Sequence, residues 1–178
     1  MKNKTQKIGF GGGCHWCTEA IFQSLIGVSH VDQGFISSFD EFDSYSEAVI
    51  VHFDPEIIDQ KTLIEIHLLT HKSTSEHSMR NKYRSAIYYL KPSNKIEIEE
   101  ALKELQNNFT DPLITKTLAF RKFKESDEMF KDYFFSNPNK PFCERYIHPK
   151  LSMLLRDFSS VMNKEKLHHE NNQTIHSK

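Results

Sequence analysis

The sequence has few of the residue types that define several large classes of protein. It holds three cysteines, one tryptophan, six glycines and six prolines among 178 residues. Three cysteines are too few for the dense disulfide frameworks of small secreted domains, so we interpret them as reactive or buried thiols. So little glycine and proline excludes a collagen-like or low-complexity chain. The chain is also long enough to bury a core of ordinary size.

The sequence also lacks an excess of one charge and a long apolar run. Its 23 Lys and Arg residues nearly balance 24 Asp and Glu residues, which argues against a nucleic-acid-binding face. No run approaches the roughly 18 apolar residues of a transmembrane helix. The N-terminus has no apolar stretch of the kind that secretory signals carry. We therefore expect a cytoplasmic protein that binds neither nucleic acid nor membrane.

What the sequence does contain is an alternation of strand and helix patterns. Apolar and β-branched runs predict strands at 5–10, 28–36, 47–53, 85–90 and 113–123. The spacing of apolar residues predicts helices at 14–26, 61–71, 94–108 and 149–162. This order predicts an α+β fold, a two-layer sandwich with a ferredoxin-like βαββαβ core and C-terminal helices. We expect one domain over residues 1–162 and a disordered polar tail over 163–178.

The most informative segment is GGGCHWC at residues 11–17, between the first strand and the first helix. A thiol in the first turn of a helix lies near free N–H groups and the positive end of the helix dipole, which favour the thiolate. Cys14 is therefore the candidate nucleophile. The Cys14-x-x-Cys17 spacing also fits a thioredoxin-like redox pair or half of a zinc site.

A metal site is the weaker interpretation of these cysteines. No second Cys-x-x-Cys is present, and only Cys143 and scattered histidines remain as partners. His67 and His71 stand four residues apart on one predicted helix, but a half-buried helix face explains them better. We expect no bound metal and no cofactor.

The segment GGGCHWCTEAIF at residues 11–22 resembles the catalytic motif of the peptide methionine sulfoxide reductase A family. The resemblance continues at 46–55, at 83–88, and at an Asn-Pro pair followed by a cysteine over 137–143, and it covers about residues 10–150. It implies thiol-dependent reduction of the S epimer of methionine sulfoxide, peptide-bound or free, in the repair of oxidised proteins.

The resemblance also implies roles for single residues. The substrate's methyl group would lie against Trp16 while Cys14 attacks the sulfur. Glu47 would act as the acid, and Tyr83 would donate a hydrogen bond to the oxygen. Cys14 would become a sulfenic acid, which Cys143 would convert to a disulfide for reduction by thioredoxin.

Three substrate-binding positions depart from the family pattern. His15 stands where the family has phenylalanine, Phe35 where it has a catalytic tyrosine, and Ser78 where it has a substrate-binding aspartate. These changes leave the nucleophile and the acid intact. They are expected to affect which substrate the protein reduces and how fast it does so.

Two alternatives and one ambiguity follow from the residues themselves. The departures allow a reductase of a different small sulfoxide. The Cys14-x-x-Cys17 spacing allows a non-catalytic redox or metal-binding module. Cys17 is also a second thiol that could condense with an oxidised Cys14, in place of Cys143.

Overall fold

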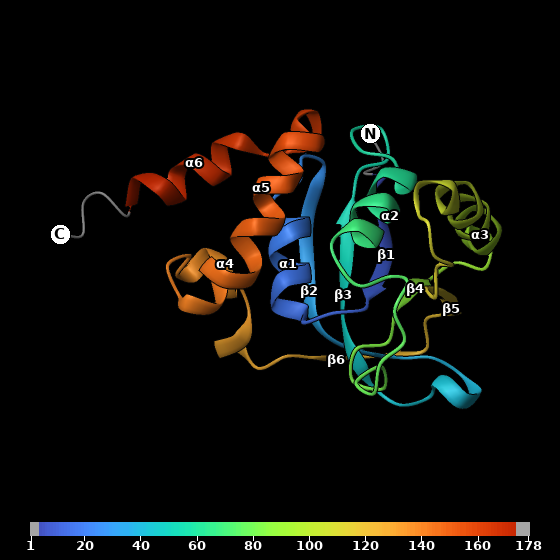
Figure 1. The fold of residues 1–178 in the computed structure, drawn as a ribbon. Coiled ribbons are helices and arrows are strands. Elements are labelled where there is room, and N and C mark those ends of the chain that lie inside the picture. Colours follow the sequence, from blue (N-terminus) through green and yellow to red (C-terminus); the bar gives the residue numbers. More distant parts are fainter. Residues whose placement is uncertain (1–3, 174–178) are drawn as a thin grey trace.

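The computed structural model describes the backbone of residues 4–173 and the side chains of residues 4–168 (Figure 1). Six strands form one mixed sheet in the order β5-β4-β1-β3-β2-β6. They are β1 (Gln6–Gly11), β2 (Val28–Ser37), β3 (Ser46–Phe53), β4 (Ala86–Tyr89), β5 (Lys116–Ala119) and β6 (Lys122–Glu125). Only β4 and β5 pair in parallel among these strands. The predicted α+β class is confirmed, while the finer ferredoxin-like description stays a prediction.

Six helices accompany the sheet, and Figure 1 shows α1 and α2 in front of it. The helices are α1 (His15–Gln23), α2 (Gln60–Leu69), α3 (Asn94–Leu105), α4 (Tyr133–Ser136), α5 (His148–Asp157) and α6 (Lys164–Gln173). Short 3₁₀ turns lie at 40–42, 106–108, 128–130 and 159–161, and a π-helical turn spans Cys143–Ile147. No helix in the described part of the chain is long and apolar enough to cross a membrane.

The central strand β3 places side chains in two separate clusters, because successive residues of a strand point to opposite faces. Val49, Val51 and Phe53 belong to the large core between the sheet and the helices. Ala48 and Ile50 belong to a smaller cluster on the other face. Burial of a large apolar side chain stabilises a fold by about 1.5–3 kcal/mol, so the large core dominates stability.

The single strand predicted at 113–123 is wrong, because the structure divides this segment between the two edges of the sheet. β5 pairs with β4 at one edge, and β6 pairs with β2 at the other. Only Phe120 and Arg121 connect them, and so few residues span at most about 11 Å. The sheet must therefore curl until its edges approach each other. The Ser38 hydroxyl donates to the Ala119 carbonyl across this closure, at 2.7 Å.

Two assignments near the C-terminus also differ from prediction. The helix predicted at 149–162 ends at Asp157, where Phe158 leaves helical geometry. The tail predicted to be disordered from residue 163 contains α6 as far as Gln173, and residues 174–178 lie outside the described residues. The Asn163 side chain caps α6 by accepting the Lys166 N–H at 3.1 Å, an interaction that favours helix initiation.

Candidate functional site

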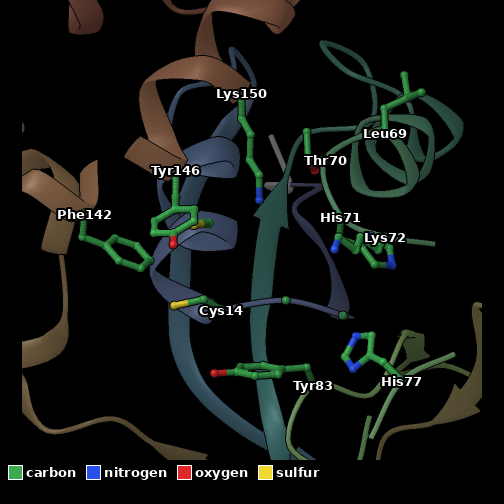
Figure 2. A pocket seen from close by; sticks show the side chains of 13 residues that line it. Cys14, Leu69, Thr70, His71, Lys72, His77, Tyr83, Phe142, Tyr146 and Lys150 are labelled. Carbon is green, nitrogen blue, oxygen red and sulfur yellow. The ribbon is translucent and has the colours of Figure 1, made fainter. Parts of the chain in front are cut away.

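Cys14 is the N-cap residue of α1 and lies in the wall of a cavity of about 610 Å³ (Figure 2). Its carbonyl accepts the N–H groups of Cys17 and Thr18 at 3.1 and 3.2 Å. The helix predicted from residue 14 therefore begins with Cys14 as its cap. The cavity is lined by Gly12, Gly13, Cys14, Cys17, Leu69, Thr70, His71, Lys72, His77, Tyr83, Phe142, Tyr146 and Lys150.

Buried His67 and half-buried His71 support the glycine turn that presents Cys14. His67 Nε2 donates to the Gly11 carbonyl at 2.8 Å, and His71 Nδ1 donates to the His67 carbonyl at 2.5 Å. Burial lowers the pKa of His67 well below its usual value and lowers the pKa of His71 to about 4. Both rings are thus neutral at physiological pH. They act as hydrogen-bonding supports, in agreement with the predicted buried helix face.

Gly12→Ala is expected to destabilise the protein and to displace Cys14. Gly12 has a φ of +151°, and an added Cβ would lie 2.5 Å from the His71 ring. A backbone held in such a region costs about 1–3 kcal/mol. Urea unfolding should show a loss of this size. Gly13→Ala is the matched control, because its Cβ would lie an ordinary 3.8 Å from His71. Equal stability of the two variants would contradict this account.

The thiols of Cys14 and Cys17 are hydrogen-bonded to each other and titrate as a pair. This bond and burial raise the pKa of Cys14, and they outweigh the hydrogen bond from the Trp16 N–H that lowers it. The same bond lowers the pKa of Cys17, and the positive charge of Lys150 lowers it further. In the reduced pair, Cys17 is therefore the thiol that ionises first. The predicted effect of the helix N-terminus on Cys14 is present but is not dominant.

Lys150→Met is expected to raise the pKa of Cys17, because the charge that stabilises its thiolate is removed. Figure 2 shows the Lys150 ammonium directed into the cavity. Alkylation of the protein at pH 7.5 should become severalfold slower, since the thiolate is the reactive form. Lys72→Met, which changes another lysine of the cavity wall, should leave the rate unchanged. If the alkylation rate of Lys150→Met equals that of the parent, Lys150 does not stabilise the Cys17 thiolate.

Glu47 and His15 form a buried pair beside the thiols. His15 Nδ1 must donate to the Gly34 carbonyl, at 2.9 Å, because a carbonyl can only accept. His15 Nε2 lies 3.2 Å from Glu47 Oε1. This contact needs one proton, either on Nε2 of an imidazolium or on the carboxyl of Glu47. The negative charge of Glu47 contributes to the raised pKa of Cys14, so the pair lies within electrostatic range of the nucleophile.

The segment that carries Tyr83 is fixed by Arg80. The Arg80 guanidinium donates to the carbonyls of Gly12 and Tyr83, at 2.9 and 3.0 Å. In Figure 2 the Cys14 sulfur lies between the rings of Tyr83 and Tyr146, and the Tyr146 hydroxyl points toward it. The structure thus brings the predicted Tyr83 to the cavity together with Cys14.

The predicted substrate-binding residues occupy different places. Ser78 is exposed, and its neighbour His77 lines the cavity. The ring of Phe35 packs against His15, with centroids 5.2 Å apart. Trp16 stacks on Tyr133 at 4.1 Å, nearly parallel, and it meets Phe142 edge-on at 5.4 Å. One face of Trp16 is therefore already covered by Tyr133.

Cys143, the recycling thiol that the family resemblance implies, lies in a helical turn. It begins the π-helical turn Cys143–Ile147, is fully buried, and donates its thiol to the Asn137 carbonyl at 3.7 Å. Burial raises the pKa of this thiol, and the nearby Cys17 raises it further. The apolar residues around it pack against α1 and keep the turn in place.

Sequence reasoning missed several residues of the cavity wall, among them a group of three near the C-terminus. Phe142, Tyr146 and Lys150 all line the cavity and lie four residues apart. This spacing places side chains on one face of a helix. The pattern is visible in the sequence, but the predicted helix at 149–162 includes only Lys150 of the three.

Comparisons with known proteins agree on one family. A family model described as peptide methionine sulfoxide reductase matches residues 6–162. Peptide methionine sulfoxide reductase MsrA of Thermus thermophilus is 32% identical over 165 residues, covering 85% of this chain and 94% of the relative. Reduced Mxr1 from Saccharomyces cerevisiae has a TM-score of 0.69 at 18% identity, covering 80% of this chain and 91% of that one. Mxr1 in complex with Trx2 has a TM-score of 0.58 at 18% identity, covering 71% and 84%.

Proposed function

Since the chain belongs to the peptide methionine sulfoxide reductase family, we propose that it reduces the S epimer of methionine sulfoxide, peptide-bound or free, with a thiol as reductant. The observation that carries this proposal is the position of Cys14. It caps α1 in the wall of a cavity, hydrogen-bonded to Cys17. The buried His15–Glu47 contact beside it needs one proton.

The proposed reaction transfers the sulfoxide oxygen to Cys14. The Cys14 sulfur attacks the substrate sulfur while its thiol proton passes to Cys17, to which it is hydrogen-bonded. The His15–Glu47 pair protonates the oxygen as the S–O bond breaks. The protonated oxygen passes as OH from the substrate sulfur to the Cys14 sulfur, while the S–S bond formed in the attack breaks and its electron pair leaves with methionine. Two electrons have then moved from Cys14 to the substrate, and Cys14 carries the oxygen as a sulfenic acid.

The remaining residues are proposed to bind the substrate. Tyr83 donates a hydrogen bond to the oxygen, and the Tyr146 hydroxyl supplies the second donor that Phe35 lacks. The methyl group lies on the uncovered part of Trp16, next to His15. His77 rather than Ser78 contacts the substrate's backbone, because His77 lines the cavity.

Recycling is proposed to begin between the hydrogen-bonded thiols of Cys14 and Cys17 and then to involve Cys143. Cys17 is hydrogen-bonded to Cys14 and condenses with its sulfenic acid, which releases water and forms a disulfide. Cys143 then attacks Cys17, frees Cys14 and carries the disulfide to the reductant. Thioredoxin is the proposed reductant, supported by the complex of the yeast protein Mxr1 with Trx2. Direct pairing of Cys14 with Cys143 stays a prediction, for which Cys143 would have to leave its buried position.

Cys143→Ser is expected to leave the first turnover intact but to slow repeated turnover with thioredoxin. Without Cys143 the oxidised protein should hold a Cys14–Cys17 disulfide, identified by non-reducing peptide mapping. Cys17→Ser is the matched variant, in which a Cys14–Cys143 disulfide would reveal direct transfer. Full thioredoxin-driven activity of Cys143→Ser would remove Cys143 from recycling.

Turnover of each sulfoxide epimer with dithiothreitol tests the proposed reaction. The S epimer of a methionine sulfoxide peptide should be reduced, and the R epimer should remain. Reduction of other small sulfoxides only would favour a different substrate, which the changes at His15, Phe35 and Ser78 allow. No reduction, together with bound zinc, would identify a metal-binding module instead.

Two wider assignments accompany this function. We propose that residues 1–162 form a single catalytic domain, which is supported by a family match over 6–162. A cytoplasmic location is proposed because the proposed cycle starts from reduced Cys14, Cys17 and Cys143, and reducing compartments keep thiols in that state.

A further inference from the structure

A second cluster of reactive side chains lies on the opposite face of the sheet. We propose that His30, Asp32 and His52 bind a divalent transition-metal ion such as Zn²⁺. The potential ligand atoms of these three residues all lie within 4.8 Å of one another. His30 and Asp32 belong to β2 and His52 to β3, so a bound ion would link two neighbouring strands.

The strand register brings the three side chains to one face. His30 lies directly opposite His52, after an irregularity in β2 between Val28 and His30. Asp32 follows His30 by two residues and so points to the same side. The intervening Val31 faces the large core beneath the helices. The cluster is therefore presented on the face that the helices do not cover.

The side chains already converge on one point. His30 Nε2 lies 2.8 Å from Asp32 Oδ1, and His52 Nε2 lies 2.6 Å from Asp32 Oδ2. Each carboxylate oxygen of Asp32 thus accepts a hydrogen bond from one ring. A metal needs to displace only the two ring protons that these hydrogen bonds hold. In a tetrahedral site with bonds near 2 Å, ligand atoms lie about 3.3 Å apart, so small side-chain movements suffice.

The chemistry of the three groups selects the type of ion. Two imidazole nitrogens and one carboxylate oxygen suit Zn²⁺, Ni²⁺ or Cu²⁺ better than Mg²⁺ or Ca²⁺. Three protein ligands leave a fourth position for water. Lys7 lies opposite His52 on the other neighbouring strand, and its positive charge should weaken binding without preventing it.

The cluster is separate from the proposed catalytic site. Glu47 precedes His52 by five residues on β3 and belongs to the opposite face. Five residues of a strand span about 17 Å. Metal binding at the cluster should therefore leave sulfoxide reduction unchanged and should instead raise the melting temperature by joining β2 to β3.

Calorimetric titration of the full chain with Zn²⁺ tests the proposal. Cys14, Cys17 and Cys143 are first replaced by serine so that thiols do not compete for the metal, because Cys17 and Cys143 are buried and their alkylation would be incomplete. One Zn²⁺ should bind per chain, and Asp32→Asn or His52→Asn should weaken binding by more than about tenfold, since even residues that only support metal ligands contribute 10–100-fold. His168→Asn, which changes an exposed histidine on α6, is the matched control and should bind as the parent does.

Thermal unfolding provides a second readout, in which a cooperative transition without Zn²⁺ first shows that each variant is folded. Zn²⁺ should raise the melting temperature of the parent and of His168→Asn, and it should leave Asp32→Asn and His52→Asn unchanged. Absence of binding to the folded serine-substituted chain would overturn the proposal. So would equal affinity of the parent, Asp32→Asn and His52→Asn.

Discussion

Cys14→Ser is expected to abolish methionine release, whereas Cys17→Ser should still release one methionine per chain, more slowly than the parent protein. Cys14 caps α1 at the cavity wall, and its sulfur is the atom that receives the oxygen. A serine hydroxyl is neither a comparable nucleophile nor able to hold the oxygen as a sulfenic acid. Cys17 lies one turn further into the helix and is buried. Its proposed tasks are to accept a proton and to condense with the product.

The two variants are compared in single-turnover experiments without reductant. Excess sulfoxide is mixed with reduced protein, and methionine is counted per chain. Because Cys17 is hydrogen-bonded to Cys14, its loss should slow the first step and leave the amount of methionine unchanged. Complete inactivity of Cys17→Ser, with activity retained in Cys14→Ser, would reverse the assignment of the nucleophile.

Glu47→Gln is expected to slow the first chemical step by about 10²–10⁴-fold, the usual contribution of general acid catalysis. The amide of glutamine can keep a hydrogen bond to His15 Nε2, but it cannot transfer a proton. Substrate binding should be little changed, because the substitution preserves the size of the side chain. The measurement is the rate of the first turnover at saturating sulfoxide.

His15→Phe is the matched variant for this experiment. It removes the partner of Glu47, whose Nε2 lies 3.2 Å away, but keeps the carboxyl group that can donate the proton. The first-turnover rate should fall less in His15→Phe than in Glu47→Gln. The decrease should depend on pH, because the proton that His15 and Glu47 share is lost. A first-turnover rate of Glu47→Gln within about twofold of the parent would exclude Glu47 as the acid.

The sequence predicted those features that depend on neighbouring residues. The apolar β-branched run of β3 and the strand–glycine–helix segment around Cys14 are local patterns, and both occur where expected. Cys14 is in the cavity wall because the turn before α1 is short and is held by His67 and His71. The position of Cys14 therefore follows from the direction in which the chain leaves β1 and from the contacts of these two histidines.

Features that depend on distant segments were not predictable in the same way. The split of 113–123 into β5 and β6 depends on the curl of the whole sheet. The sequence presented His15 as an altered pocket wall, whereas its contact with Glu47 requires β2 and β3 to pair. Likewise, His30 and His52 are far apart in sequence and meet only through the register of these strands.

Detection of a sulfenic acid on Cys14 tests the central claim most directly. A Cys17→Ser, Cys143→Ser double variant is treated with one equivalent of the S epimer in the presence of dimedone, which traps sulfenic acids. The account predicts one methionine released and one dimedone adduct per chain, located by peptide mapping on Cys14. Methionine release without an adduct on Cys14 would contradict it.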